Sequence, residues 1–235
     1  MRSSDEQTKR LFHGLPKGRF DGETALLCID LQRLDADTGK GLFEKARKSG
    51  VEAGLSEYRH QLLVALPKVA RLQDAFRRAG MEVLHIRIQA ITQDGRDRSK
   101  IHKAMGIHAA PGSVEAEFVP EAAPKGDEIV LNKTSASPFT STAIDYVLQN
   151  LNIRHLVVVG VMTSGCVEST VRDAADRGYV VSLVSDACAG RTAEMQEKTL
   201  SALGGLYAHL MTTKEVLGGL ESAQQTGDAD QVPTR

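Results

Sequence analysis

Short apolar runs alternate with longer amphipathic segments along most of the chain. The runs are rich in β-branched residues and cover residues 24–30, 81–88, 127–133, 154–161 and 179–187, with a shorter one at 209–212. Because they show little polar alternation, they are typical of parallel strands that helices cover on both faces. We therefore predict an α/β fold: a three-layer α/β/α sandwich around a mostly parallel, six-stranded sheet.

The segments between these runs carry apolar residues at helical spacing. The longest covers residues 58–79 and stops at Gly80, a residue typical of helix C-termini. Pro67 inside this segment predicts a kink or a break into two helices. Further helices are predicted at residues 141–150, 165–177 and 193–206.

Two long stretches lack clear periodicity. They cover residues 32–55 and 89–126, and each follows a predicted strand. Open α/β sheets bind ligands at the carboxyl ends of their strands, so these stretches are either pocket walls or ordinary surface loops. No repeat or composition break divides the chain, which predicts one domain over residues 1–222. Residues 223–235 are polar, and we expect a disordered tail there.

Composition and charge argue against several classes of partner. The 29 Lys and Arg residues and 30 Asp and Glu residues give a formal net charge of -1, which leaves no electrostatic footprint for nucleic acid or a membrane surface. The chain has no Trp and only 4% aromatic residues, too few for a surface that stacks single-stranded bases. No secretory signal is visible, and no run approaches the roughly 18 apolar residues of a membrane span. We therefore expect a soluble, cytoplasmic protein that acts on a small molecule.

The three cysteines are Cys28, Cys166 and Cys188. An odd number at such wide spacing cannot form a full disulfide framework and fits a reducing compartment. Cys28 lies in a predicted strand and Cys188 follows another, so both are expected to pack as small apolar residues. Cys166 begins a predicted helix, where the helix dipole and backbone N–H groups favour a thiolate and can hold an oxyanion. The alternative is that Cys166 simply packs beneath this helix.

The turn before Cys166 contains glycines but does not match a nucleotide-binding loop. Gly160 and Gly165 are spaced like the first two glycines of a P-loop. However, Cys166 and Val167 stand where that loop needs Lys and Ser or Thr. A dinucleotide fingerprint needs a glycine at the position of Met162. The sequence supports neither nucleotide site.

Two ionisable residues end other predicted strands. Asp30 closes the run TALLCID, and Lys133 closes DEIVLNK. A carboxylate at such a place is costly unless it is paired or hydrogen-bonded. Since the carboxyl ends of parallel strands meet at one edge, Asp30, Lys133 and Cys166 are expected to converge there. A structural ion pair between Asp30 and Lys133, with Cys166 unrelated, explains the spacing equally well.

Three motifs in order resemble the isochorismatase-like cysteine hydrolases. They are CIDLQ around Asp30, NKTSASPFTST around Lys133, and GVMTSGCVESTVRDAADRGY followed by SDACAG around Cys166. The resemblance runs from about Thr24 to about Leu217. This family includes nicotinamidases, N-carbamoylsarcosine amidohydrolase, ureidoacrylate, maleamate, biuret and triuret hydrolases, and isochorismatase itself.

The resemblance implies a role for each of these residues. Cys166 would be the nucleophile, Asp30 the base that takes its proton, and Lys133 the cation that stabilises the thiolate. The resemblance also implies a cis peptide bond between Val161 and Met162. The backbone N–H groups of Met162 and Cys166 would then form an oxyanion hole.

Differences between subfamilies narrow the predicted chemistry. Isochorismatases that cleave a vinyl ether lack the cysteine, so Cys166 favours attack on an amide or ureido carbonyl. Nicotinamidases bind a metal through an Asp-x-His pair, which is missing after the second predicted strand. We therefore predict no metal and no other cofactor. His85, His102 and His108 are then interpreted as structural or surface histidines.

Arg191 in SDACAGRT is a candidate for substrate binding. It matches the position at which carbamoylsarcosine- and maleamate-type enzymes bind the substrate carboxylate, and a guanidinium fork suits that role. A solvated arginine at a helix start is the alternative. Weaker candidates, chosen because they flank strand ends or the Lys133 motif, are Gln32, Arg87, Gln89 and Phe139.

The resemblance predicts a cysteine-dependent amidohydrolase. It would cleave a C–N bond of a small linear amide, carbamoyl or ureido compound through a thioester and with release of ammonia, and Arg191 would suit a substrate that carries a carboxylate. Relatives commonly form dimers or tetramers, so we expect a homodimer or homotetramer. The alternatives are an isochorismatase-type ether hydrolase and a catalytically silent oligomeric binding protein. Pyruvate release would identify the first, and complete inactivity together with a specific protein partner would identify the second.

Overall fold

All six predicted apolar runs contain strands. The computed structural model describes residues 14–229. Its strands are β1 (Thr24–Ile29), β2 (Glu82–Ile88), β3 (Val130–Lys133), β4 (His155–Val161), β5 (Val180–Ala189) and β6 (His209–Met211). They pair in the order β3-β2-β1-β4-β5-β6, and every pairing is parallel. The predicted six-stranded sheet is confirmed.

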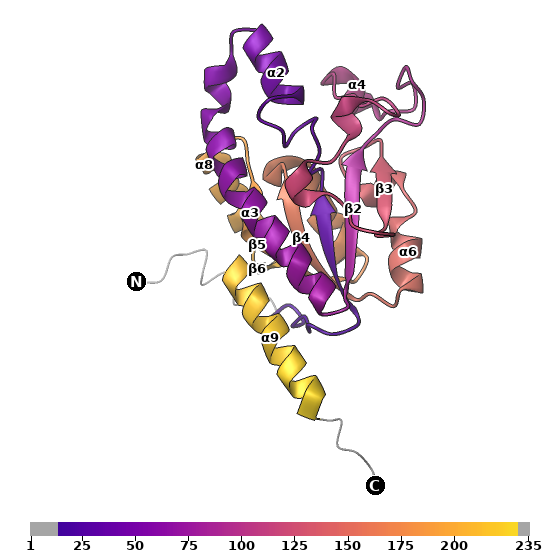
Figure 1. Cartoon of the computed structure of the whole chain (residues 1–235), viewed down its shortest axis with the longest axis vertical. Helices are drawn as coiled ribbons and strands as arrows, with labels where there is room; N and C mark the ends of the chain where they lie inside the picture. The colour runs from indigo at the N-terminus through magenta and orange to yellow at the C-terminus, as the bar shows by residue number, and fades with distance from the viewer. Residues whose placement is uncertain (1–13, 230–235) are drawn as a thin grey trace.

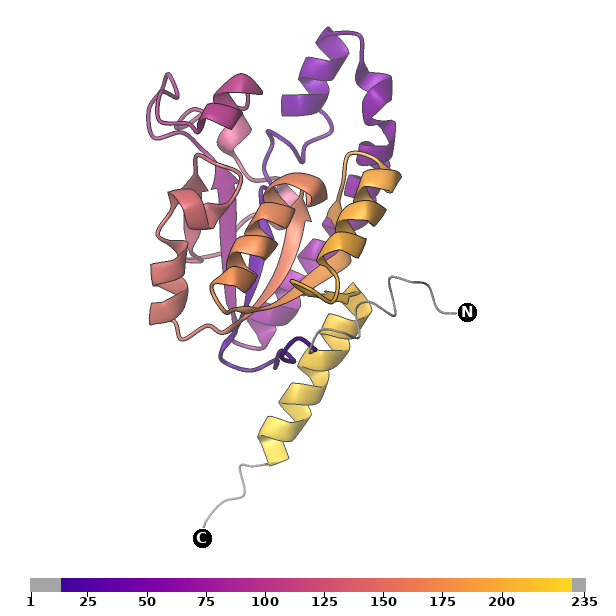
Figure 2. The same cartoon turned by 180° about the vertical axis from the view of Figure 1, so that it is seen from behind.

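Helices cover both faces of this sheet (Figures 1 and 2). They are α2 (Gly41–Lys48), α3 (Ser56–Arg78), α4 (Lys100–Ala104), α5 (Pro138–Ser141), α6 (Ile144–Asn150), α7 (Glu168–Asp176), α8 (Ala193–Leu203) and α9 (Thr213–Ala229). Short 3-10 turns cover Glu52–Leu55, Val114–Ala116 and Pro120–Ala122. Helices α3 and α9 pack on one face, and α6, α7 and α8 pack on the other. The predicted three-layer α/β/α sandwich is therefore confirmed.

The central strand β1 explains why the apolar runs lack polar alternation. Each of its residues is buried, and successive side chains enter the cores on opposite faces. Leu26 and Cys28 belong to the core beneath α3, whereas Leu27 and Ile29 belong to the core beneath α6 and α7. A strand covered on both faces needs apolar residues at every position.

Helix α3 runs without a break through Pro67, so the predicted division into two helices is wrong. Proline removes one backbone hydrogen bond inside a helix. Here Pro67 is exposed, while Leu66 and Val69 beside it are buried against the sheet. The carbonyl that loses its donor lies on the solvent side, where water can replace the missing bond. Packing of the apolar face therefore keeps the helix continuous.

Two further expectations need correction. Helix α9 extends to Ala229, so residues 223–229 are helical rather than disordered, while residues 230–235 lie outside the described residues. Val216 and Leu220 anchor the first part of α9 in the core, and the helix continues past the body of the molecule (Figure 1). Strand β5 reaches Ala189, which places Cys188 inside the strand instead of after it.

The two stretches without periodicity fold together at the carboxyl edge of the sheet. They contain α2 and α4, which lie at the ends of the strand arrows in Figure 1. Gln32 forms an isolated antiparallel bridge with Phe118, and the Arg33 N–H donates to the carbonyl of Glu117 at 2.8 Å. A cavity of about 400 Å³ lies between the stretches. They are therefore pocket walls rather than unrelated surface loops.

Within residues 14–229, no helix combines the length and the apolar character that crossing a membrane requires.

Candidate active site

The strand ends bring the three predicted residues into contact. The Nζ atom of Lys133 lies 2.9 Å from Oδ2 of Asp30, and both side chains are at most 1% exposed. The same Nζ donates to Sγ of Cys166 at 3.1 Å. Cys166 therefore contacts the Asp30–Lys133 pair instead of lying apart from it. A buried acid, a cation and a thiol share one point at the carboxyl edge of the sheet.

Asp30 occupies an unusual backbone conformation. It follows β1 directly and has a φ of 53°, in the left-handed region that residues other than glycine rarely adopt. Its N–H donates to the carbonyl of Ile86 at 2.8 Å, which holds the backbone in place. On the neighbouring strand, a Cβ at Gly160 would lie 2.1 Å from the carbonyl oxygen of Ile29. Glycine is required there because β1 and β4 approach closely beside Asp30.

Lys133 has a partner for each of its three donors. Besides Asp30 and Cys166, it donates to the carbonyl of Ser135 at 3.0 Å. Burial alone disfavours the ammonium, but the negative charges of Asp30 and Cys166 outweigh it and raise the pKa of Lys133. The side chain therefore stays protonated while its partners exchange a proton.

The Asp30 carboxylate has few donors. Among residues 14–229, neither of its oxygens accepts a backbone N–H or hydroxyl hydrogen bond. Burial raises the pKa of Asp30, and the Lys133 charge opposes that rise. A carboxylate with a raised pKa is a stronger base, so Asp30 is suited to accept the proton of a nearby thiol.

Cys166 lies on a kinked turn instead of in the first turn of a helix. The turn covers Thr163–Val167, and Ser164 and Gly165 within it have non-helical backbone angles. Helix α7 begins only at Glu168. The peptide bond between Val161 and Met162, just before this turn, is cis, the isomer that the family resemblance implied.

The pKa of Cys166 shifts in the direction opposite to our expectation. Burial and the charge of Asp30 raise it, and Lys133 opposes the rise. Sequence reasoning placed the thiol against a helix dipole and did not include a carboxylate beside it. The thiol is therefore the favoured form of Cys166, and its proton must be transferred before the sulfur can attack.

Three of the weaker binding candidates have structural roles. Gln32 is fully buried, and its amide nitrogen donates to the carbonyls of Ile88 and Glu115 at 2.9 and 2.8 Å. Arg87 donates to Oδ1 of Asn132 at 2.7 Å and covers the Phe118 ring at 5.4 Å. Phe139 is buried in the core near α7, with its ring 5.9 Å from that of Tyr179. These side chains hold backbone or core together, and their assignment to the pocket stays a prediction.

Gln89 and Arg191 lie where a pocket role remains feasible. Gln89 is half-buried, and its N–H donates to the carbonyl of Lys133 at 3.1 Å, directly beside the triad. Arg191 is exposed on the loop between β5 and α8. Side chains of α3 fix this loop: Gln61 accepts from the N–H of Gly190 at 2.9 Å, and Glu57 accepts from that of Ala193 at 2.7 Å.

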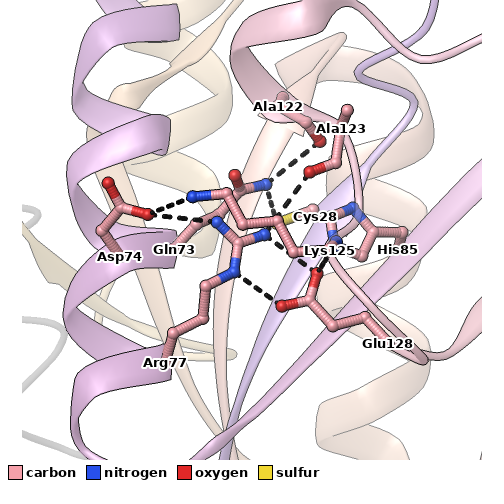
Figure 3. A network of polar contacts seen from close by, with 9 residues as sticks. All are labelled: Cys28, Gln73, Asp74, Arg77, His85, Ala122, Ala123, Lys125 and Glu128. Atoms are coloured by element: carbon pink, nitrogen blue, oxygen red, sulfur yellow. Dashed lines mark hydrogen bonds and ion pairs between the residues drawn. The ribbon is translucent and has the colours of Figure 1, made fainter.

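His85 belongs to a structural network on the α3 side of the sheet (Figure 3). Its Nε2 lies 2.9 Å from Oε2 of Glu128, and Arg77 binds the same carboxylate through two nitrogens at 2.6 and 2.9 Å. Burial lowers the pKa of His85, so the ring is neutral. Gln73 donates to Sγ of Cys28 in the same network at 3.4 Å.

His102 and His108 lie on the long stretch between β2 and β3. His102 is buried in α4, where burial and the Lys133 charge lower its pKa to about 4. Nε2 of His108 lies 3.2 Å from the carbonyl oxygen of Gln93. Across residues 14–229, no three histidine, cysteine or acidic side chains gather closely enough to hold a metal ion.

Sequence reasoning missed two residues beside the triad, Asp35 and Tyr58. Tyr58 is fully buried on α3, and its hydroxyl donates to the carbonyl of Asp35 at 2.7 Å. Charges of Asp35, Asp30 and Cys166 act on this phenol and, with burial, raise its pKa well above the usual value. The only signal in the sequence is an extra acid five residues after Asp30. Acidic residues are common in polar loops, so this one does not stand out.

The chain is similar in sequence to known proteins. A family model described as the isochorismatase domain matches residues 24–215. An uncharacterized isochorismatase family protein, YddQ, from Bacillus subtilis (strain 168) is 30% identical over 204 residues, which cover 83% of this chain and 98% of that protein. The ureidoacrylate amidohydrolase RutB from Acinetobacter baylyi (strain ATCC 33305 / BD413 / ADP1) is 27% identical over 216 residues, covering 86% of each chain.

The fold is also similar to solved structures. A cysteine hydrolase from Pseudomonas syringae pv. phaseolicola 1448A aligns with a TM-score of 0.77 at 23% identity, covering 90% of this chain and 99% of that one. At this identity the likeness concerns the fold alone.

Proposed function

This chain belongs to the isochorismatase family of hydrolases, and from that premise we propose that it is a cysteine-dependent amidohydrolase. Its substrate would be a small linear amide, carbamoyl or ureido compound. One observation carries the proposal: a single ammonium, that of Lys133, contacts both the Asp30 carboxylate and the Cys166 sulfur. The similarity to ureidoacrylate amidohydrolases supports a C–N bond as the one cleaved.

The first step creates the nucleophile and forms a thioester. Asp30 takes the proton of the Cys166 thiol, and the thiolate attacks the substrate carbonyl carbon. The carbonyl electrons move to oxygen, where backbone N–H groups of Met162 and Cys166 stabilise the negative charge. The tetrahedral intermediate then collapses, the C–N bond breaks, and the leaving nitrogen takes the proton from Asp30 as ammonia departs.

The second step releases the acid and restores the thiol. Asp30, again ionised, takes a proton from water while the water oxygen attacks the thioester carbon. The C–S bond breaks, and the sulfur regains the proton that Asp30 holds. The raised pKa of Asp30 suits a group that accepts and returns a proton in each half-reaction.

Lys133 remains protonated throughout this cycle. Its charge stabilises the Asp30 carboxylate in the resting site and the Cys166 thiolate after proton transfer. Because the same ammonium contacts both atoms, negative charge moves between them without losing its counterion.

The test is ammonia release from maleamate, ureidoacrylate, biuret, triuret, malonamate and several N-carbamoyl amino acids. Cys166→Ala is expected to lower kcat/KM for each substrate found by about 10³-fold or more. Brief mixing followed by intact-mass measurement should detect the acyl group on wild type and not on Cys166→Ala. The matched control is Cys188→Ala, which removes a thiol buried in β5 away from the triad.

Three results would contradict the proposal. Full amide hydrolysis by Cys166→Ala would exclude the thioester mechanism. Pyruvate release from isochorismate, without amide hydrolysis, would favour the ether-hydrolase alternative. Inactivity on the whole panel together with a specific protein partner would favour a binding protein.

A further inference from the structure

The turn that follows Asp30 places a second acid, Asp35, beside the triad. The N–H of Asp35 donates to the carbonyl of Gln32 at 3.2 Å, and its own carbonyl accepts from the Tyr58 hydroxyl at 2.7 Å. Gln32 and Tyr58 are themselves fully buried. The backbone of Asp35 is therefore fixed by groups that cannot move easily, and this places the root of its side chain beside the triad.

Asp35 also lines the cavity of about 400 Å³ between the two long stretches. Apolar side chains, including Leu42 and Met105, form one part of its wall. The charged part consists of Asp35, Glu44, Glu115, Lys45 and Lys48. Three carboxylates against two ammonium groups leave one negative charge uncompensated when all are ionised.

Among residues 14–229, Asp35 and Glu115 are the two cavity carboxylates without an ion pair, and Asp35 is the one whose charge interacts with Asp30 and Lys133. Glu44 pairs with Lys48 at 2.8 Å on the same cavity wall. By contrast, the Asp35 carboxylate makes no ion pair or hydrogen bond with any residue between 14 and 229. Burial and the charge of Asp30 raise the pKa of Asp35 to about 7, and Lys133 opposes the rise. Asp35 thus faces the catalytic charges on one side and the cavity on the other.

We propose that Asp35 is a specificity-determining residue that binds a positively charged group at the far end of the amide substrate. The substrate's charged end would occupy the cavity while its carbonyl reaches Cys166. This inference rests on the proposed amidohydrolase function, because it assigns the part of the substrate that does not react. An unpaired carboxylate on a fixed backbone, in a partly apolar cavity, is the group expected to recognise a protonated amine.

The experiment uses three primary amides of equal length: 3-aminopropanamide, 3-hydroxypropanamide and malonamate. They differ only in a positive, neutral or negative far end. Wild type is expected to prefer 3-aminopropanamide. Asp35→Asn should lower kcat/KM for it about tenfold, through KM, and change 3-hydroxypropanamide less than twofold. Asp35→Glu should restore part of the preference because it returns the charge.

A pH series gives a second readout. The Asp35 pKa of about 7 means that its carboxylate forms as pH rises from 6 to 8. KM for 3-aminopropanamide should therefore fall over that range in wild type and stay flat in Asp35→Asn. Asp30, Lys133 and Tyr58 face Asp35 from the packed elements, and Lys45, His108 and Glu115 face it across the cavity. Because the charge of Asp35 also acts on Asp30 and Tyr58, the same series with 3-hydroxypropanamide is the reference: a pH dependence of KM that Asp35→Asn removes for 3-aminopropanamide alone is due to the Asp35 charge at the binding site.

Asp127→Asn is the matched control, since Asp127 is exposed before β3 and loses the same charge. An equal effect of both substitutions, or no preference for 3-aminopropanamide in wild type, would overturn the inference while Cys166-dependent hydrolysis leaves the proposed function intact. If no amide is hydrolysed, calorimetry on Cys166→Ala with and without Asp35→Asn still decides: tighter binding of 3-aminopropanamide only with Asp35 supports the role, and equal binding refutes it.

Discussion

Two carboxylates at opposite edges of the sheet behave in opposite ways. Glu128 is partly buried just before β3, and it accepts two bonds from Arg77, one from the N–H of Lys125 at 2.9 Å and one from His85 (Figure 3). These donors outweigh burial and lower its pKa to about 2. Asp30 is fully buried directly after β1; it has the ammonium of Lys133 as its ion-pair partner, and burial raises its pKa. Deeper burial and fewer donors together separate the base from the structural anchor.

The cysteines in the two regions, Cys28 and Cys166, differ in whether a base lies beside the thiol. Cys28 accepts a weak hydrogen bond from Gln73, and burial raises its pKa to about 12 with no base in contact. Cys166 also has a raised pKa, but Asp30 and Lys133 are beside it. A buried thiol without a neighbouring base has nowhere to deliver its proton. Proximity to Asp30 therefore distinguishes the reactive cysteine from the packing cysteine.

The largest predicted effect comes from removing the base. Asp30→Asn should lower kcat by about 10²–10⁴-fold, the usual contribution of a general base. Iodoacetamide labelling of Cys166, followed by peptide mass spectrometry, should slow together with hydrolysis, because the thiol loses the group that takes its proton. If labelling continues at the wild-type rate while hydrolysis falls, Asp30 does not activate the thiol.

The second effect concerns Glu128, whose carboxylate accepts several hydrogen bonds, and it should appear in the free energy of unfolding. Glu128→Gln should lower the unfolding free energy at pH 7 by about 3 kcal/mol, because the folded-state pKa is near 2 against a usual 4.5. The lowered pKa means that this stabilisation is complete above about pH 5 and is lost as pH falls towards 2. Urea unfolding at several pH values measures it, and the variant should lose most of this acid dependence.

The same Glu128→Gln protein provides the control for the comparison. Its kcat/KM should remain within about twofold of wild type at a temperature where it is folded, since the network lies away from the triad. A catalytic defect as large as that of Asp30→Asn would remove the distinction between the two regions.

The smallest effect is expected for Cys28→Ala. Removing one sulfur from the core beneath α3 should lower the unfolding free energy by about 1 kcal/mol and leave hydrolysis unchanged. Native-state labelling should remain confined to Cys166, because Cys28 and Cys188 are buried, whereas Cys166 is partly exposed and lies beside the Asp30–Lys133 pair. Loss of activity in Cys28→Ala would place this thiol in the reaction.

The sequence predicted the features that depend on local pattern and sheet geometry. Strands covered on both faces appear as unbroken apolar runs, and parallel strands carry Asp30, Lys133 and the turn of Cys166 to one edge. Features that depend on contacts between residues far apart in the chain could not be predicted from the sequence. The side-chain amide of Gln32 donates to the carbonyl of Glu115, far along the chain, and no local signal predicts that contact. The direction of the Cys166 pKa shift likewise depends on Asp30, which only the folded chain brings near.

Helix α3 has a consequence for how this scaffold can change its substrate range. Its first two turns bind two segments that follow strands of the sheet: the Tyr58 hydroxyl donates to the Asp35 turn, and Glu57 and Gln61 accept from the loop of Arg191. One helix therefore sets the spacing between the turn of Asp35 and the loop of Arg191. Substitutions in these two turns of α3 can change that spacing without replacing Asp30, Lys133 or Cys166.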